Sequence, residues 1–171
     1  NGVFGMADLL MRTELTTRQQ RLVHTINQSA SSLLTIINDI LDVSRMEAGK
    51  FTLDRIPFDL RASIEDVVDL LSDSAQKKKI EQTLLIAPDV PAMVMGDPGR
   101  IRQICTNIIS NAIKFTPAGD VSISVTCISR SDRHATIDIT VKDTGIGIPL
   151  DVQERLFQPF HQADTSITRR F

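Results

Sequence analysis

Apolar positions along this chain change their spacing near residue 50, and the first part has helical spacing. Residues 3–12 predict a short helix, the mostly polar residues 13–17 interrupt it, and a second helix runs to about Gly49. Along the second helix, apolar or small residues recur in steps of four and three, as at a helical-bundle seam: Ile26, Ala30, Leu33, Ile37 and Ile40. Because the first helix is too short to cover this seam, we expect a second copy of the chain to complete a four-helix bundle as a homodimer.

From residue 51 onward the pattern is that of a mixed α/β domain, so we place domain boundaries at 1–50 and 51–171. Asp59 predicts the cap of a helix with one apolar stripe: Leu60, Ile64, Val67, Val68, Leu71 and Ala75. Asp97 and Pro98 predict the start of a second helix, which runs to Phe115. The remaining expected segments are strands at 51–56 and 80–87, a connection at 88–96, a hairpin of strands around 121–127 and 135–141 joined by residues 129–133, and a short helix at 150–157.

Composition narrows the possible partners. The formal net charge is -2 and the chain has neither Trp nor Tyr, so it lacks the basic surface of a nucleic-acid-binding protein and offers little on which bases could stack. No apolar run approaches the roughly 20 residues of a membrane span, so we expect no direct membrane contact from this segment. Cys105 and Cys127 occupy apolar positions and are expected to be reduced and packed, which favours a cytoplasmic segment, with a membrane-anchored parent protein still open.

The helix from Pro98 to Phe115 carries the first candidate chemistry. Its expected buried face comprises Ile101, Ile104, Cys105, Ile108 and Ala112. At 100° per residue the polar side chains cluster within about 80° on the other side: Arg100, Gln103, Asn107, Asn111 and Lys114. Two amides four residues apart are unusual on a solvated helix face, where better helix formers are common. Their oxygens suit a magnesium ion beside phosphates, and Lys114 suits a phosphate.

The second candidate feature is the turn after the last predicted strand, where Asp143 is followed by Gly145 and Gly147. A carboxylate at a strand end can accept a hydrogen bond from an exocyclic amine, which would distinguish adenine from guanine. Glycines permit backbone angles and close approaches that other residues exclude. Alone, such a sequence is most often an ordinary turn. Together with the amide helix, it predicts a nucleotide pocket.

These motifs resemble the catalytic core of sensor histidine kinases, most closely the hybrid type. Residues 107–115 are similar to the family's asparagine box, 143–147 to its first glycine box and 156–160 to its phenylalanine box. Residues 1–6 are similar to the stretch just after the family's phosphoacceptor box, and residues 40–50 to the end of its second dimerisation helix. The resemblance covers essentially the whole chain and implies an α+β fold, in which a helical hairpin precedes an α/β sandwich ATP-binding domain of the histidine kinase, Hsp90 and gyrase type.

The resemblance also implies roles for individual residues, with ATP and Mg²⁺ as cofactors. Asn111 and Asn107 would hold the metal, Lys114 would contact a phosphate, and Phe115 would line the adenine side. Asp143 would read the adenine amine. The pocket floor and the lid anchors would come from two further pairs of residues: Gly145 with Gly147, and Phe157 with Phe160.

The resemblance implies transfer of the γ-phosphoryl group of ATP to a histidine, then to an aspartate on a response-regulator receiver domain. The acceptor would lie just before Asn1 and a second glycine box after Phe171. None of the chain's own histidines, His24, His134 and His161, replaces the acceptor, so no catalytic residue is predicted within the chain. Two alternatives stay open at this point. One is a kinase-like dimerisation scaffold without catalysis. The other is an ATP hydrolase of the same superfamily, which the amide at Asn107 disfavours because it cannot act as a general base.

Overall fold

The structure is a computed structural model that describes residues 2–153. Its contacts divide the chain into two compact units, Asn1–Thr52 and Leu53–Phe171. No helix among the described residues is long and apolar enough to cross a bilayer.

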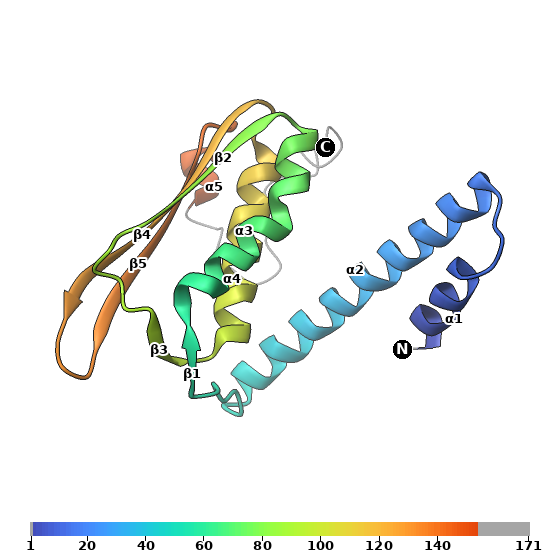
Figure 1. Ribbon diagram of the computed structural model, residues 1–171. Helices are drawn as coiled ribbons and strands as arrows, with labels where there is room; N and C mark the ends of the chain where they lie inside the picture. The colour runs from blue at the N-terminus through green and yellow to red at the C-terminus, as the bar shows by residue number, and fades with distance from the viewer. Residues whose placement is uncertain (1, 154–171) are drawn as a thin grey trace. The chain divides into compact units, whose positions relative to one another are not determined.

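The first unit is a helical hairpin of α1 (Gly2–Met11) and α2 (Thr17–Glu47), as predicted (Figure 1). Thr16 starts α2 through a capping box: its hydroxyl accepts from the Gln19 N–H, and the Gln19 side chain accepts from the Thr16 N–H at 2.9 Å. Ala7 of α1 and Val23 of α2 are the buried apolar residues of the hairpin. The helix ends at Glu47, and Gly49, two residues later, has a φ of 63°, the left-handed geometry that glycine adopts without strain.

The predicted bundle seam on α2 lies at the surface of the chain. Its four large side chains are 42% to 58% exposed: Ile26, Leu33, Ile37 and Ile40. Ala30 is half-buried. The hairpin therefore leaves an apolar helix face without a partner among the described residues.

The second unit is built on a three-stranded sheet with the order β2-β4-β5. Strand β2 (Ile80–Ile86) pairs in parallel with β4 (Gly119–Arg130), and β4 pairs in antiparallel fashion with β5 (Ala135–Asp143). A separate two-stranded antiparallel sheet joins β1 (Ile56–Asp59) to β3 (Met93–Gly96). Alternation of buried and exposed residues is clearest on β4, where Val121, Ile123 and Val125 are almost fully buried.

Two helices cover one face of the three-stranded sheet (Figure 1): α3 (Leu60–Lys77) and α4 (Pro98–Phe115). The first core cluster brings together Val67 of α3, Ile109 of α4 and Val121 of β4. The second cluster, around Phe58 and Val125, attaches the small sheet to the far end of the large one. The predicted helical hairpin followed by an α/β domain is therefore confirmed.

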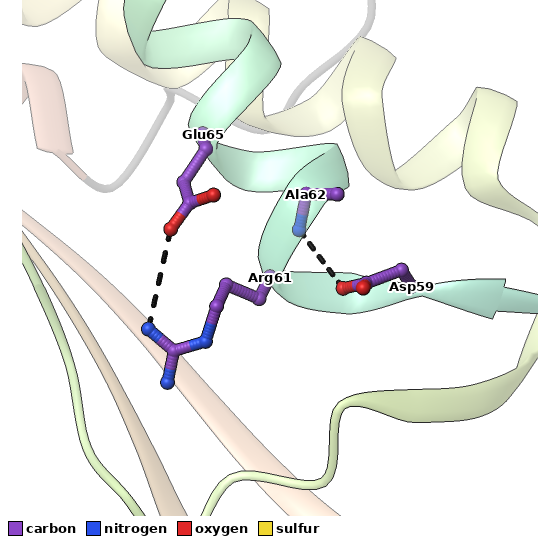
Figure 2. A network of polar contacts seen from close by, with 4 residues as sticks. All are labelled: Asp59, Arg61, Ala62 and Glu65. Atoms are coloured by element: carbon purple, nitrogen blue, oxygen red, sulfur yellow. Dashed lines mark hydrogen bonds and ion pairs between the residues drawn. The ribbon is translucent and has the colours of Figure 1, made fainter.

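Helix α3 begins where the sequence predicts. The Asp59 carboxylate accepts from the Ala62 N–H at 2.9 Å, and Arg61 lies 4.0 Å from Glu65 one turn along (Figure 2). Both ends of the Arg61–Glu65 pair are about half exposed, so the cap does more than the pair to hold the first turn. The predicted stripe is buried or half-buried along its length.

Two strand predictions were wrong. Residues 51–55 are irregular, and the strand lies at Ile56–Asp59 and includes Pro57. Proline is tolerated because β1 pairs only with β3 and is an edge strand. Strand β3 was missed within the expected connection 88–96, because it is four residues long and both of its methionines face outward.

The buried face of α4 was also predicted wrongly in part. Ile104 and Ile108 are 58% and 47% exposed, whereas Ile109 and Ile113 are buried. The helix turns its buried face toward the sheet and α3, which places Ile104 and Ile108 roughly 80° or more from the centre of that face. These two isoleucines instead lie on the exposed side of α4, next to the amide side chains.

The last predicted helix begins at Leu150, and its described part is α5 (Leu150–Gln153). The rest of that helix, and the predicted lid anchors Phe157 and Phe160, lie outside the described residues.

Candidate nucleotide-binding site

Helix α4 provides one wall of the site, and Asp97 fixes its start. One carboxylate oxygen of Asp97 accepts from the Arg100 N–H at 3.0 Å, and the other accepts from the Asp54 N–H at 3.1 Å. These backbone hydrogen bonds, the one from Arg100 first, hold the pKa of Asp97 below its ordinary value of 3.8. Pro98 at the first helical position needs no N–H partner.

Asn107 and Asn111 lie one turn apart on the exposed side of α4. The Asn111 amide nitrogen donates to the Asn107 amide oxygen at 3.4 Å, a long hydrogen bond that turns the two side chains toward each other. No described residue donates to the amide oxygen of Asn111. This oxygen is therefore free to bind a ligand.

Lys114 is exposed at the last turn of α4, with its ammonium group 4.9 Å from the centre of the Phe115 ring. A cation near a ring face gains a modest attraction and leaves its N–H groups open to solvent. The positive charge of Lys114 thus lies beside the face of the half-buried Phe115 ring.

Lys78, at the end of α3, holds the carboxyl end of α4. Its ammonium group donates to the carbonyl oxygens of Ile113 at 2.9 Å and of Lys114 at 2.6 Å. Carbonyl groups in the last turn of a helix have no partner within the helix, and the helix dipole makes that end negative. Lys78 thereby fixes the turn of α4 that carries Lys114 and Phe115.

The turn after β5 forms the opposite wall. The Gly145 N–H donates to one oxygen of the exposed Asp143 carboxylate at 2.8 Å, and the Ile146 N–H donates to the Phe115 carbonyl at 3.2 Å. The second Asp143 oxygen has no partner among the described residues. The turn thus fixes the Asp143 carboxylate through one oxygen and leaves the other oxygen able to accept from a ligand.

Gly145 allows this turn to lie directly against α4. A methyl group at Gly145 would lie 2.5 Å from the Phe115 carbonyl oxygen and 2.7 Å from the Asp143 carboxylate. Both distances are shorter than any stable carbon contact, so a side chain here would push the turn away from the helix. Gly147 meets a different need: a methyl group there would contact nothing within 4 Å, but its φ of 67° is in the left-handed region that favours glycine.

Thr144 ties the same turn to the start of β4. Its N–H donates to the Asp120 carbonyl at 3.2 Å, and the Asp120 N–H donates to its hydroxyl at 3.0 Å. Gly119, at φ 123°, leaves the space that the Thr144 hydroxyl fills. The turn is therefore held on both sides, by α4 and by β4.

The structure thus brings together the predicted residues Phe115, Asp143 and Gly145. Asn111 and Asn107 lie about 6 Å and 12 Å further back along the helix axis, at 1.5 Å per residue. Sequence reasoning missed the residues that fix the two walls, namely Lys78, Gly119, Asp120 and Thr144. Their contacts join segments up to 36 residues apart, so no local pattern could reveal them.

This set of donors and acceptors fits a magnesium-bound nucleotide. The open oxygen of Asp143 can accept from an exocyclic amine, and Phe115 beside it offers an apolar edge. No group of three or more His, Cys, Asp or Glu side chains that could hold a metal occurs within residues 2–153. Magnesium commonly takes only one or two protein oxygens when phosphates and water supply the rest, which is what Asn111 and Asn107 could give.

The fold and the site define a class of protein: an ATP-binding domain of the histidine kinase, gyrase and Hsp90 type preceded by a helical hairpin. Residues 96–170 match the family described as Histidine kinase-, DNA gyrase B-, and HSP90-like ATPase. Residues 1–49 match the His Kinase A (phospho-acceptor) domain. The chain belongs to the histidine kinase family.

The chain is also similar in sequence to histidine kinases and sensor proteins, which supports this assignment. The chain is 51% identical over 170 residues to the signal transduction histidine-protein kinase BarA of Escherichia coli, a match that covers 99% of this chain and 18% of BarA. It is 45% identical over 170 residues to the sensor protein GacS of Pseudomonas syringae, covering 99% of this chain and 19% of GacS. The chain thus spans about a fifth of the length of these relatives.

Among solved structures, the chain is similar to full-length ShkA in complex with AMPPNP. The TM-score is 0.74 at 35% identity, and the match covers 94% of this chain and 34% of ShkA.

Proposed function

We propose that this chain is the catalytic core of a sensor histidine kinase, of the hybrid type, which binds ATP with Mg²⁺. Its γ-phosphoryl group would pass to a histidine outside the printed sequence, and then to an aspartate on a response-regulator receiver domain. The observation that carries the proposal is the held Asp143 carboxylate, with one open oxygen, against the end of the helix that bears Asn107, Asn111 and Lys114. Binding of AMPPNP by ShkA supports the same choice of nucleotide.

In this proposal each site residue has one task. Asp143 accepts from the adenine amine, and Phe115 packs at the base. Lys114 meets a phosphate, and the amide oxygens of Asn111 and Asn107 hold the metal without adding negative charge beside the phosphates. Gly145 and Gly147 shape the floor, and Phe157 and Phe160 anchor the lid.

The proposed reaction replaces a phosphorus–oxygen bond of ATP with a phosphorus–nitrogen bond to histidine. The neutral imidazole nitrogen attacks the γ-phosphorus, a P–N bond forms, and the bond to the β,γ-bridging oxygen breaks so that ADP leaves with that oxygen. Bound Mg²⁺ would neutralise charge on the phosphates. The residues of this chain would supply position and charge, which is where most of the catalysis of phosphoryl transfer lies.

We further propose that the chain forms a homodimer through the exposed seam of α2, with residues 1–50 as the dimerisation domain and 51–171 as the ATP-binding domain. Four large apolar side chains at bundle spacing face solvent on α2, and α1 leaves them uncovered. Replacing Leu33 and Ile37 by Asp should convert the dimer to a monomer in light scattering. The control Leu70→Asp, at a leucine of α3 that is 71% exposed, should leave the mass unchanged.

The deciding experiment uses a longer chain that includes the acceptor histidine and the second glycine box. It is incubated with Mg²⁺ and γ-labelled ATP, next to the same chain with Asp143→Asn or Asn111→Ala. Label that is stable in alkali, labile in acid and lost in both variants would establish histidine phosphorylation through this pocket. Asn38→Ala, an exposed amide of α2, serves as the matched control and should retain the label.

Two results would overturn the proposal. Nucleotide binding without any label would leave a dimerisation scaffold. Steady ATP hydrolysis in a chain whose acceptor histidine is replaced would assign the pocket to a hydrolase.

A further inference from the structure

A cavity of about 370 Å³ lies at the end of the large sheet opposite to the nucleotide site. One wall is the small β1–β3 sheet, with Pro57, Met93 and Met95, and the other is the tip of the β4–β5 hairpin. The cavity and the nucleotide site lie at opposite ends of β4. Asp120 contacts the nucleotide turn, and Arg130 lines the cavity, ten residues or roughly 33 Å further along the strand.

The lining of the cavity is basic, although the chain as a whole has a net charge of -2. Arg55 comes from the segment before β1, Arg130 from the end of β4 and Arg133 from the hairpin tip. Asp132 is the one acidic residue in the lining, and none of the three arginines forms an ion pair with any residue that the structure describes. Three guanidinium groups thus converge without a counter-charge within 4 Å.

Paired backbone holds both walls in place before any ligand arrives. Pro57 lies opposite Met95 in the small sheet, and Arg130 lies opposite Ala135 in the hairpin. The hairpin tip is closed by the Ser131 N–H, which donates to the His134 carbonyl at 2.7 Å. A site that is already formed loses little conformational entropy on binding.

The β1–β3 wall of the cavity suits apolar side chains. Phe58 and Val94 point into the second core cluster, which turns the alternate residues of β3 outward and leaves Met93 and Met95 each 60% exposed. Methionine side chains are flexible and polarizable, and they adapt to varied apolar partners. The cavity therefore joins an apolar surface to three arginines, whose guanidinium groups can bind carboxylates through two parallel hydrogen bonds.

We propose that this cavity is a docking site for an acidic polypeptide segment, in which carboxylate side chains alternate with apolar ones. The carboxylates pair with Arg55, Arg130 and Arg133, and the apolar side chains rest on Met93 and Met95. The volume of the cavity admits two or three side chains, so the rest of the segment runs across the rim. The occupant is a separate partner polypeptide of this alternating chemistry, because the arginines of the lining supply the complementary charge.

The test measures fluorescence polarisation of a labelled nonapeptide in which Glu and Leu alternate, added to the 171-residue chain. A second peptide carries Gln in place of each Glu, and a third carries Lys. We expect the Glu peptide to bind at least tenfold more tightly than the Gln peptide, and its affinity to fall as salt rises. Arg130→Glu combined with Arg133→Glu should weaken the Glu peptide at least tenfold, whereas Lys142→Glu, an exposed cation on β5 outside the lining, should change its affinity less than twofold.

The charge-reversed variant also tests whether the site survives the substitutions. If it is folded and the cavity is the docking site, it should gain affinity for the Lys peptide. Equal loss in Lys142→Glu, or no gain for the Lys peptide in a variant with unchanged circular dichroism, would overturn the proposal. So would displacement of the Glu peptide by tripolyphosphate or by phosphatidylserine vesicles at equal charge concentration, because the site would then take polyanions in general.

Discussion

The ammonium group of Lys78 lies 2.6 Å from the carbonyl oxygen of Lys114, 36 residues further along the chain. A second donation, to Ile113 at 2.9 Å, makes Lys78 the cap of a helix to which it does not belong. Lys78 lies at the carboxyl end of α3, and it holds the last turn of α4, which carries the proposed phosphate contact Lys114. This cap links the stability of the domain to the geometry of the site.

Replacing Lys78 by Met should expose this link, since Met keeps the apolar stem and removes the donors. Two helix-terminal carbonyls would lose a charged donor, so the free energy of unfolding should fall by about 1–2 kcal/mol in urea titration. Affinity for ATP should fall as well, because the last turn of α4 loses its anchor. Lys77→Met, at an exposed neighbour, is the control. Equal losses in the two variants would show that Lys78 contributes only its charge.

Gly145→Ala should damage the site more than Gly147→Ala. The new methyl group at position 145 would meet the Phe115 carbonyl at 2.5 Å, so the turn must move and take Asp143 with it. We expect a loss of about 1–3 kcal/mol in stability and at least a tenfold loss in ATP affinity. At position 147 only the backbone angle is strained, which costs about 1–2 kcal/mol and leaves Asp143 in place. Calorimetry of nucleotide binding would decide, and equal affinity in the two alanine variants would contradict the proposed contact.

The Asp97 cap predicts a dependence of stability on pH. Its pKa is lowered in the folded state, chiefly by the Arg100 and Asp54 N–H groups, so the charged form favours folding. The contribution is complete above the unfolded value near 3.8 and is lost as the pH falls through the still lower folded value. The difference in unfolding free energy between the native chain and Asp97→Asn should therefore be largest near neutral pH and shrink toward pH 2. A difference that stays constant over this range would refute the assignment.

The two cysteines should react at different rates with iodoacetamide. Cys105 is buried, and burial raises the pKa of its thiol above 9.0, so little thiolate is present and access is blocked. Cys127 is half-buried and should be alkylated first at pH 8. Mass spectrometry of digested samples would show this order, and unfolding in urea should equalise the two rates. Early modification of Cys105 in the folded chain would place it outside the core.

Helix positions and starts were predictable because they depend on local signals. Asp59 and Asp97 each accept from an N–H three residues on, a contact within the reach of a single turn. The amides, Lys114 and the Asp143 turn were proposed as site residues from their types and spacing, whereas the three phenylalanines were proposed from the family resemblance alone. Their roles stay predictions.

The errors came from positions whose environment depends on distant segments. Ile104 looks like a core residue, yet the rotation of α4 is set by what α3 and β4 place beneath it. Strand β3 exists because Met93 to Gly96 pair with residues of β1 that lie 34 to 40 positions earlier in the chain. A strand of four residues is too short for its hydrophobic pattern to indicate a pairing partner so distant in sequence. The same limit hid the donation from Lys78 to α4.

The parallel pairing of β2 with β4 has a consequence for biosynthesis. Ile80 lies opposite Gly119, so β2 leaves the ribosome well before its neighbour exists. At the usual rate of about 5–20 residues per second, roughly 2–8 seconds pass before β4 can begin to pair. During that interval α3 and α4 can form from local contacts, but β2 has no strand to pair with on the side that β4 will occupy. The nucleotide turn is held by Asp120 of β4, so it is among the last parts of the described chain to form. We therefore expect a nascent chain to bind ATP only after β4 and β5 have joined the sheet.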